Sequence, residues 1–522
     1  MRVPCEQAVL RSGGNEGPCG EKAKPWILAA TILGSSMAFI DGTVVNVALP
    51  AIQASFHATV VDVQWVVESY GLFLGALILV GGSLGDLFGR RMIFVAGVLV
   101  FAGASAACGF ASNIHPLIAA RSVQGVGAAL MVPGSLAIIS TSFDEKSRGQ
   151  AIGTWSGFTA ITTAVGPVLG GWLVEHASWR WAFFINLPIA ASVIVISLLQ
   201  IPESRRLALG RIDWIGALLA ILGLGGLVYG LLESADLGWV NRLVLGSLIL
   251  GFGGLVAFVF VEARVASPMV PLILFRSRTF TGANLLTLLL YAAIGIFFFL
   301  FPLNLIQVQG YTPTAAGSAI LPLIGLMFVL SRWAGRLVDR YGARGPLIIG
   351  PLIAAAGFGL FAVPSIGGSY WKAFFPAIVI LGSGMTVTVA PLTTVVMNSV
   401  KEDRVGAASG INNAVARVAG VLAIAVLGIV MVKAFSFRLD RSLAGLSLSP
   451  SILHEVQASE IKLAGLQLPA GLDPAADTAI KKFVSEAFVY GFRIVMSICA
   501  SLSLASAAVA LLMIPHNHDP RA

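Results

Sequence analysis

The chain contains one motif twice, first as Gly82-Ser-Leu-Gly-Asp86-Leu-Phe-Gly-Arg-Arg91 and again as Gly335-Arg-Leu-Val-Asp339-Arg-Tyr-Gly-Ala-Arg344. The two aspartates are 253 residues apart (339 minus 86). A second matching pair surrounds Gly149 and Gly406, which lie 257 residues apart (406 minus 149). Two matches at nearly one offset indicate a duplicated half rather than coincidence.

Composition defines the environment of both halves. Of the 522 residues, 57% are hydrophobic and 11% are charged, whereas a typical soluble domain has about 25% charged residues. The mean hydropathy is +0.89, which leaves too little polar material to cover a soluble surface. These values exclude a soluble globular protein, a disordered chain and a collagen-like chain. We therefore expect an all-α integral membrane protein whose surface faces lipid.

Fourteen apolar segments are long enough to cross a bilayer, which takes about 20 mostly apolar residues. The predicted spans are 26–48, 63–82, 92–111, 115–139, 150–174, 181–201, 212–232, 242–262, 280–304, 315–334, 346–365, 373–396, 406–432 and 488–514.

Basic residues are divided unevenly between the loops. Lys and Arg total 21 in the tails and the loops on their side of the membrane, and 3 in the short loops opposite. Because basic residues accumulate in cytoplasmic loops, both termini are expected in the cytoplasm, with the spans in the plasma (inner) membrane. The net charge of +8 then reflects orientation in the membrane, not nucleic-acid binding. Residues 1–24 lack the apolar region of a secretory signal, so we expect the first span to direct insertion.

The repeat and the spans together predict the domain organisation. The offset covers eight spans although each repeated unit needs only six, so two helices are inserted between the halves. Both copies of the motif lie on the cytoplasmic side, which indicates parallel repeats about an axis normal to the membrane. Residues 433–487 form a long extracytoplasmic loop whose apolar periodicity predicts one or two amphipathic helices. The expected segments are a tail at 1–25, a six-helix bundle at 26–201, inserted helices at 202–279, a second bundle at 280–514 and a tail at 515–522.

Further motifs resemble those of a known family. The first span carries Ile40-Asp41-Gly-Thr-Val-Val-Asn46-Val-Ala-Leu-Pro50, and the fourth carries Leu117-x-x-x-Arg121-x-x-Gln124-Gly-x-Gly127. The fifth carries Gly166-Pro167-x-x-Gly170-Gly171, and the sixth begins with Trp179-Arg-Trp-Ala-Phe-Phe-Ile-Asn186-x-Pro188. With the motif at Gly82, these stretches resemble the major facilitator superfamily, specifically its fourteen-helix drug:proton antiporters of the EmrB/QacA group. The resemblance implies two six-helix bundles plus two inserted helices, and multidrug efflux that confers drug resistance.

Two acids are candidates for proton coupling. Asp41 lies inside an apolar span, where a charge costs about 2.5–3.5 kcal/mol on insertion scales, so the carboxyl must be paired, hydrated or protonated. Glu68 follows Trp65 near the start of the second span. Alternatively, Asp41 hydrogen-bonds helix ends near Gly42 and Thr43, and Glu68 is an interfacial carboxylate favoured by the helix dipole.

Two arginines lie inside spans. Arg121 is a permanent cation that needs a carboxylate, carbonyl groups or water when buried. The family resemblance places it near the proton route, and the alternative is a static pair that joins the fourth span to the first. Arg417 belongs to none of these motifs, and the sequence favours neither a functional nor a structural role for it.

The duplicated motif is expected to form a conformational latch. Its glycines favour a tight cytoplasmic turn, in which the aspartate accepts bonds from helix-end amides and neighbouring arginines. Anchoring by the positive-inside rule is the alternative, and it explains the arginines but not the Gly/Asp spacing. The predicted latch residues are Gly82, Asp86, Gly89, Arg90, Arg91, Asp339 and Arg344.

The fifth span has small residues at helical spacing, which favours close contact with a partner helix, and a proline that removes one backbone hydrogen bond. A plain packing helix would need no Gly-Pro there, and the resemblance associates this motif with antiport. The predicted residues of the antiporter motif are Gly153, Gly166, Pro167, Gly170 and Gly171, with Gly157 completing the first pair of small residues.

Aromatic and polar side chains in the spans are candidates for a substrate cavity. Aromatic faces attract hydrophobic cations, although such a run more often faces lipid or fills the core. The predicted cavity residues are Asn46, Tyr291, Phe298, Asn304 and Arg417.

Sequence motifs for other chemistry are missing. The chain has no phosphate-binding loop, no paired histidines for a metal and no serine-hydrolase elbow, so we expect no enzyme, no catalytic residue, no metal and no cofactor. The expected function is proton-driven export of small amphipathic or cationic compounds, with the proton gradient as energy source. The partners would be the small-molecule substrate, protons and membrane lipid, with no nucleic acid, and an accessory export subunit stays open. The alternatives are export or uptake of one metabolite on the same fold, or a membrane sensor or enzyme without transport.

Overall fold

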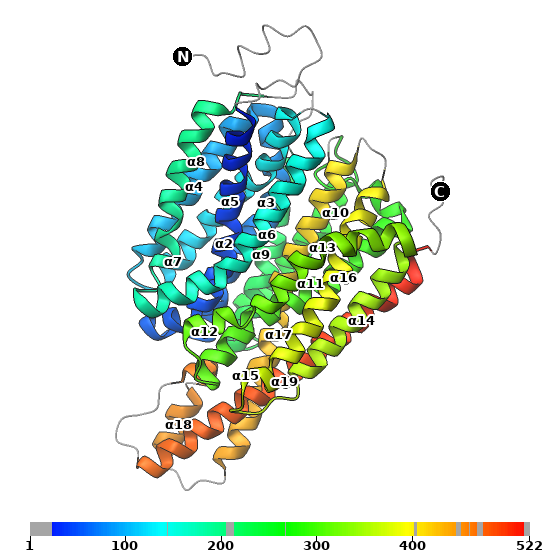
Figure 1. Cartoon of the computed structure of the whole chain (residues 1–522). Coiled ribbons are helices and arrows are strands. Elements are labelled where there is room, and N and C mark those ends of the chain that lie inside the picture. The colour runs from blue at the N-terminus through cyan, green and yellow to red at the C-terminus, as the bar shows by residue number, and fades with distance from the viewer. Residues whose placement is uncertain are drawn as a thin grey trace, which may run out of the picture.

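The computed structural model describes residues 23–143, 145–204, 213–266, 268–400, 404–444, 450–458, 460–466 and 473–515. These residues form helices and connecting turns without a strand (Figure 1). Fourteen of the helical segments are long and apolar enough to cross a membrane. Both the predicted all-α membrane fold and the predicted number of spans are therefore confirmed.

The helices follow the order of the predicted spans. The first six spans consist of α2 (Lys24–Phe56), α3 (Val60–Phe88), α4 (Arg90–Gly109), α5 (Ile114–Ser142), α6 (Glu145–His176) and the broken pair α7 (Trp181–Phe184) and α8 (Asn186–Gln200). The next two spans are α9 (Trp214–Leu237) and α10 (Arg242–Glu262), followed by the short turn η1 (Leu272–Arg276).

The last six spans are interrupted more often. They consist of α11 (Arg278–Leu303) with the π-turn η2 (Asn304–Val308), α12 (Pro313–Ser318) with α13 (Leu321–Tyr341), α14 (Arg344–Phe361), α15 (Tyr370–Ala373) with α16 (Phe375–Asn398), α17 (Val405–Leu443) and α19 (Pro474–Met513). Between α17 and α19 lie α18 (Pro450–Ala458) and the 3-10 turn η4 (Glu460–Gly465).

Contacts divide the helices into two groups. In the first half, α5 packs against α3 and α4, and α2 packs against α6 and α8. In the second half, α11 and α14 both pack against α19, α11 also packs against α17, and α14 against α16. The halves meet where α3 contacts α17 and where α6 contacts α12.

The two inserted helices differ in their surroundings. α10 exposes large apolar side chains such as Ile249, Leu250 and Phe252, as expected for a helix that faces lipid. α9 packs against α10 on one side and contacts both α3 and α17. α10 therefore presents a surface suited to lipid, whereas α9 lies beside the contact between the halves.

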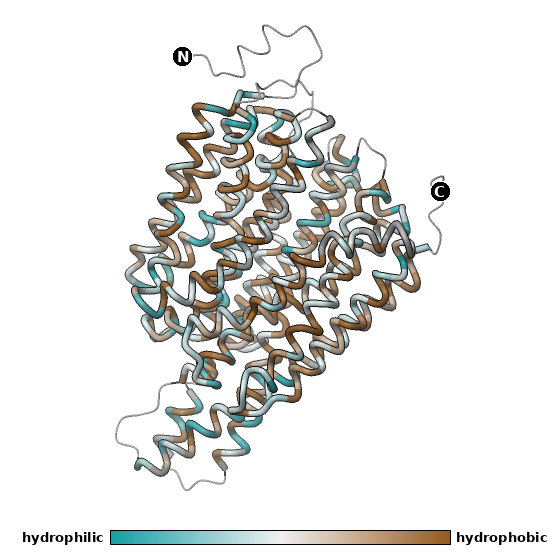
Figure 2. Tube along the Cα trace, in the orientation of Figure 1, coloured by the Kyte–Doolittle hydropathy of each residue, from teal (hydrophilic) through white to brown (hydrophobic). Residues whose placement is uncertain are grey.

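One end of the molecule protrudes. α17 and α19 are longer than the other helices and extend past the spans, where α18 and η4 connect them (Figure 1). The hydrophobic residues follow the spans, and hydrophilic residues are more frequent in this protruding part (Figure 2). The periodic residues Ile480–Val484 belong to the extension of α19, so part of the predicted amphipathic structure continues a span.

Glycines allow α4 and α5 to approach closely. A Cβ atom at Gly127 would lie 2.5 Å from the backbone nitrogen of Phe101, and one at Gly97 would lie 2.9 Å from the carbonyl oxygen of Gly127. Gly103 on α4 has open space beside it and is exposed. The backbones of α4 and α5 are therefore too close at Gly127 to leave room for a side chain.

We predict that Gly127→Leu destabilises the protein, because the backbone of α4 cannot move without losing its other contacts. Overpacking of this kind costs about 1–3 kcal/mol or more. The measurement is the thermal unfolding of the protein purified in detergent, with Gly103→Leu as the matched control. The expected result is a lower melting temperature for Gly127→Leu alone; equal melting temperatures for both variants would contradict the close contact.

Candidate functional site

Asp41 on α2 and Arg121 on α5 form a buried ion pair in the first half. The Nη1 atom of Arg121 donates to Oδ2 of Asp41 at 2.5 Å. The exposed fraction is 0% for Asp41 and 1% for Arg121. Because both charges are removed from water, each depends on the other for stabilisation.

Neutral polar groups complete the surroundings of the pair. The side-chain amide of Gln124 donates to Asp41 Oδ1 at 2.8 Å, and that of Asn186 donates to the same oxygen at 3.4 Å. Gln124 Oε1 accepts from Arg121 at 2.7 Å. Ser105 accepts from the amides of both Gln124 and Asn186. The carboxylate and its partners form a closed network contributed by α2, α4, α5 and α8.

Arg121 also contacts α3, the helix of the second span. Its Nε atom donates to the carbonyl oxygen of Val66 at 3.0 Å, and its guanidinium lies 4.3 Å from the centre of the Tyr70 ring. The hydroxyl of Thr43 bonds to carbonyl groups of its own helix, not to Asp41. In this conformation Asp41 and Arg121 therefore form a buried pair that joins α2 to α5.

Glu68 lies apart from this network. Its exposed fraction is 0%, and neither carboxyl oxygen has a hydrogen-bond partner among the described residues. It shares one face of α3 with Gln64, Gly71 and Gly75, at the spacing of a helical stripe. Each of these neighbours contacts α17: Gln64 donates to the carbonyl oxygen of Ile424, and the two glycines face α17 side chains. Glu68 thus lies in the contact between α3 and α17, which we call the seam.

Arg417 lies on the other side of the seam. It is half-buried, and its Cβ atom would be 3.3 Å from a Cβ atom at Gly75. Its guanidinium reaches toward the first half, with Cζ 5.8 Å from the centre of the Phe39 ring. No ion pair of Arg417 occurs within the described part of the chain.

The first copy of the duplicated motif connects three helices at the end of the molecule where α2 begins. Arg90 pairs with Asp86 at 2.7 Å, and Gly89 adopts a φ of 120°, which favours glycine. The first amides of α4 are capped by Glu203, which accepts from the backbone nitrogens of Arg91 and Met92 at 3.1 Å each. The expected capping by Asp86 is therefore made by Glu203, a residue that the sequence analysis did not single out.

Two further positions complete the first copy. Gly82 lies inside α3, not in the turn, where a Cβ atom would make ordinary contact with Pro133. The Arg91 guanidinium donates to the carbonyl oxygen of Ile201, past the C-terminus of α8. A cation there is favoured by the helix dipole.

The second copy repeats this arrangement. Gly342 has a φ of 70°, and Arg344 donates to the carbonyl oxygen of Leu511 at 2.6 Å, near the C-terminus of α19. The side chain of Asp339 is outside the described residues. In both copies the final arginine therefore binds the end of the last helix of its own half. The described contacts of the motif lie within each half, and the conformational latch stays a prediction.

The glycine motif of α6 packs against two helices. Cβ atoms at Gly166 and Gly170 would collide with α2, at Thr43 and Val44. A Cβ atom at Gly171 would overlap the carbonyl oxygen of Pro313, and one at Gly317 would overlap that of Pro167. This end of α6 therefore joins α2 and α12 at the end opposite the termini. Gly153 and Gly157, by contrast, have open space beside them, so the first pair of small residues makes no such contact.

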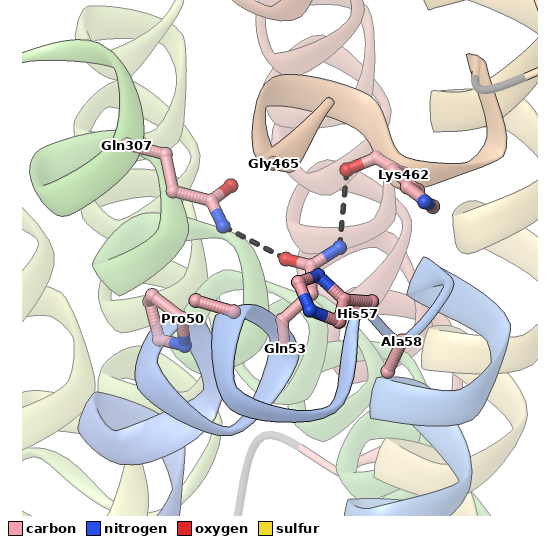
Figure 3. A pocket seen from close by; sticks show the side chains of 8 residues that line it. Pro50, Gln53, His57, Ala58, Gln307, Lys462 and Gly465 are labelled. Atoms are coloured by element: carbon pink, nitrogen blue, oxygen red, sulfur yellow. Dashed lines mark hydrogen bonds between the residues drawn. The ribbon is translucent and has the colours of Figure 1, made fainter. Parts of the chain in front are cut away.

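A small pocket lies at the same end of the molecule (Figure 3). Gln53 of α2 accepts a bond from Gln307 of η2 at 2.8 Å and donates to the carbonyl oxygen of Lys462 in η4 at 3.1 Å. A Cβ atom at Gly465 would lie 2.8 Å from Gln53 Oε1. The pocket volume of about 50 Å³ is far below the roughly 300–1,000 Å³ of a drug site. These contacts close the two halves against each other at this end.

An acid pair lies where the protruding segment meets α17. Burial, with a smaller contribution from the neighbouring Asp440, raises the pKa of Glu460 to about 7. Asp440 also accepts a bond from Gln457 at 2.8 Å.

The remaining predicted cavity residues fall into two groups. Asn46, Tyr291 and Phe298 are half-buried, and Asn46 bonds to the carbonyl oxygen of Gly42. Asn304 is buried in the π-turn η2, where it accepts a bond from Gln309. Asn304 is therefore part of the helix break.

We predict that Asp41→Asn lowers stability, because it leaves the buried Arg121 charge without a partner. Breaking a buried pair from one side costs about 3–5 kcal/mol. Thermal unfolding and the amount of protein in the membrane measure the effect. The double variant Asp41→Asn/Arg121→Gln removes both charges and is expected to regain stability. A single variant as stable as the unmodified protein would refute the anchoring role.

Comparison with known proteins identifies the family. A family model described as Major Facilitator Superfamily matches residues 31–424. The chain is 33% identical to the tetracenomycin C resistance and export protein of Streptomyces glaucescens, over 96% of this chain and 94% of that one. It is 37% identical to the multidrug resistance protein Stp of Mycobacterium tuberculosis, over 79% and 77%. A bacterial homologue of the human lysosomal transporter Spinster has the same fold, with a TM-score of 0.64 at 18% identity and coverage of 94% and 98%. The chain belongs to the major facilitator superfamily.

Proposed function

We propose that the chain is a proton-coupled exporter of small amphipathic or cationic compounds that works by alternating access. The proton gradient supplies the energy, and both termini lie in the cytoplasm of a cell whose plasma membrane holds the spans. The resistance and export functions in the names of the relatives support this proposal. The positive-inside distribution of Lys and Arg supports the orientation.

The observation that carries the proposal is the isolation of Glu68. An ionised carboxylate without a partner in a buried site carries a penalty of several kcal/mol. Glu68 has no partner in the seam, so its carboxyl group holds a proton in this conformation. Asp41, by contrast, is paired with Arg121. Glu68, not Asp41, is thus the group that exchanges a proton.

Proton movement at Glu68 is linked to the movement of the halves. Loss of the proton makes the present packing of Glu68 against α17 unfavourable, so the deprotonated form favours a different relative position of α3 and α17. Binding of a proton favours the conformation seen here, in which the end opposite the termini is closed. A proton gradient directed into the cell then drives the substrate-free transporter back to the conformation that is closed at the end opposite the termini.

We predict that Glu68→Gln abolishes exchange of substrate for protons, because glutamine fills the same space but cannot take up or release a proton. Everted membrane vesicles with an imposed pH gradient provide the measurement, as an exporter dissipates the gradient when a toxic hydrophobic cation is added. Glu233→Gln is the matched control, since Glu233 on α9 is bonded to Trp65 and lies outside the α3–α17 contact. Proton release by Glu68→Gln at the rate of the unmodified protein would contradict the assignment.

The proposed orientation predicts which cysteines react from outside. Cys5 and Cys19 lie in the N-terminal tail, while Cys108 and Cys499 are buried. A membrane-impermeant maleimide is expected to label the variant His454→Cys, on exposed α18, in intact cells. The tail cysteines should react only after the membrane is opened or inverted. Labelling of the tail in intact cells would reverse the orientation.

A further inference from the structure

The seam holds an acid on α3 and a base on the facing helix α17, and neither forms an ion pair with another residue that the structure describes. Glu68 of α3 is fully buried without a hydrogen bond, and Arg417 of α17 is half-buried without an ion pair among the described residues. Arg121, the other buried cation nearby, is already paired with Asp41. If Glu68 loses its proton, Arg417 is therefore the cation that remains available in the seam.

Pairing of Glu68 with Arg417 requires α3 and α17 to shift relative to each other along the seam. Arg417 lies beside Gly75, which has no side chain to block it. Glu68 is seven residues from Gly75, or about 10 Å along the helix at 1.5 Å per residue, and the flexible arginine side chain covers part of that distance. α3 and α17 belong to different halves, so rocking of the halves changes their relative position along the seam.

We propose that Arg417 pairs with Glu68 after the proton has left, and that the transported compound takes the place of Arg417. This inference rests on the proposed function of Glu68. The pair connects the two halves through α3 and α17. It holds the empty, deprotonated carrier in one conformation until a compound arrives.

By holding the substrate-free, deprotonated transporter in one conformation, the pair prevents protons from crossing the membrane without export of substrate. A carrier that changes conformation both with a proton and empty lets protons cross without export. The Glu68–Arg417 pair slows the conformational change of the transporter that carries neither proton nor substrate. A compound that binds Glu68 in place of Arg417 breaks the pair and allows the change. Proton movement is then possible only together with export.

The pairing also defines the chemistry of the compound. To replace a guanidinium it must present a positive charge or several hydrogen-bond donors to Glu68. The ring of Phe39, which faces the Arg417 guanidinium, provides an apolar surface for the rest of the molecule. A cation joined to a planar apolar body meets both requirements.

The test measures proton leak without any substrate. The full-length protein is placed in liposomes with an imposed pH gradient and an internal pH dye. Arg417→Gln is expected to leak protons about tenfold faster than the unmodified protein, the factor given by the loss of about 1.4 kcal/mol. Arg417→Lys keeps the charge and should leak little. The double variant Glu68→Gln/Arg417→Gln should not leak, because it has no proton carrier.

A second measurement separates pairing from a structural role. In Arg417→Ala the space of the side chain is empty, so guanidinium ions added to the liposomes should slow the leak, with no such effect on the unmodified protein. A leak in Arg417→Gln equal to that of the unmodified protein, or no response of Arg417→Ala to guanidinium, overturns the inference. If Glu68→Gln still exchanges substrate for protons, the proposed function fails. If Glu68→Gln loses this exchange but Arg417→Gln shows no increased proton leak, only this inference fails.

Discussion

A charge in the interior of a membrane protein needs a partner, and this constraint assigns the roles of the buried acids. Asp41 and Arg121 satisfy each other and are enclosed by the amides of Gln124 and Asn186. Such a pair holds α2 to α5. Glu68 has no hydrogen-bond partner in the described part of the chain, and an ionised carboxylate there would be unfavourable. Proton exchange is therefore assigned to the contact between the halves, not to the core of the first half.

The contacts of the duplicated motif explain how the halves can move as units. Arg91 binds the carbonyl oxygen of Ile201, and Arg344 binds that of Leu511, so each motif secures the last helix of its own half. These bonds do not depend on the angle between the halves. The contacts that must change during transport are the seam and the closed end near Gln53 (Figure 3).

Local patterns in the sequence predicted the fold, because span length, hydropathy and the repeat are all properties of short stretches. The pairing of Asp41 with Arg121 was foreseen only as an alternative, since nothing local shows whether two buried charges face each other. Glu203 was missed because the amides it caps lie more than 100 residues away along the chain. Gly153 looked like a contact residue by spacing, but only the structure shows the open space beside it.

Infrared difference spectroscopy tests the central assignment most directly, because a protonated carboxyl group has its own carbonyl band. On a step from acidic to alkaline pH, the unmodified protein should lose the bands of the acids that release a proton, one of them from Glu68. The account predicts that this band is missing in Glu68→Gln and still present in the double variant Asp41→Asn/Arg121→Gln. A band that persists in Glu68→Gln and vanishes when Asp41 is replaced would contradict the account.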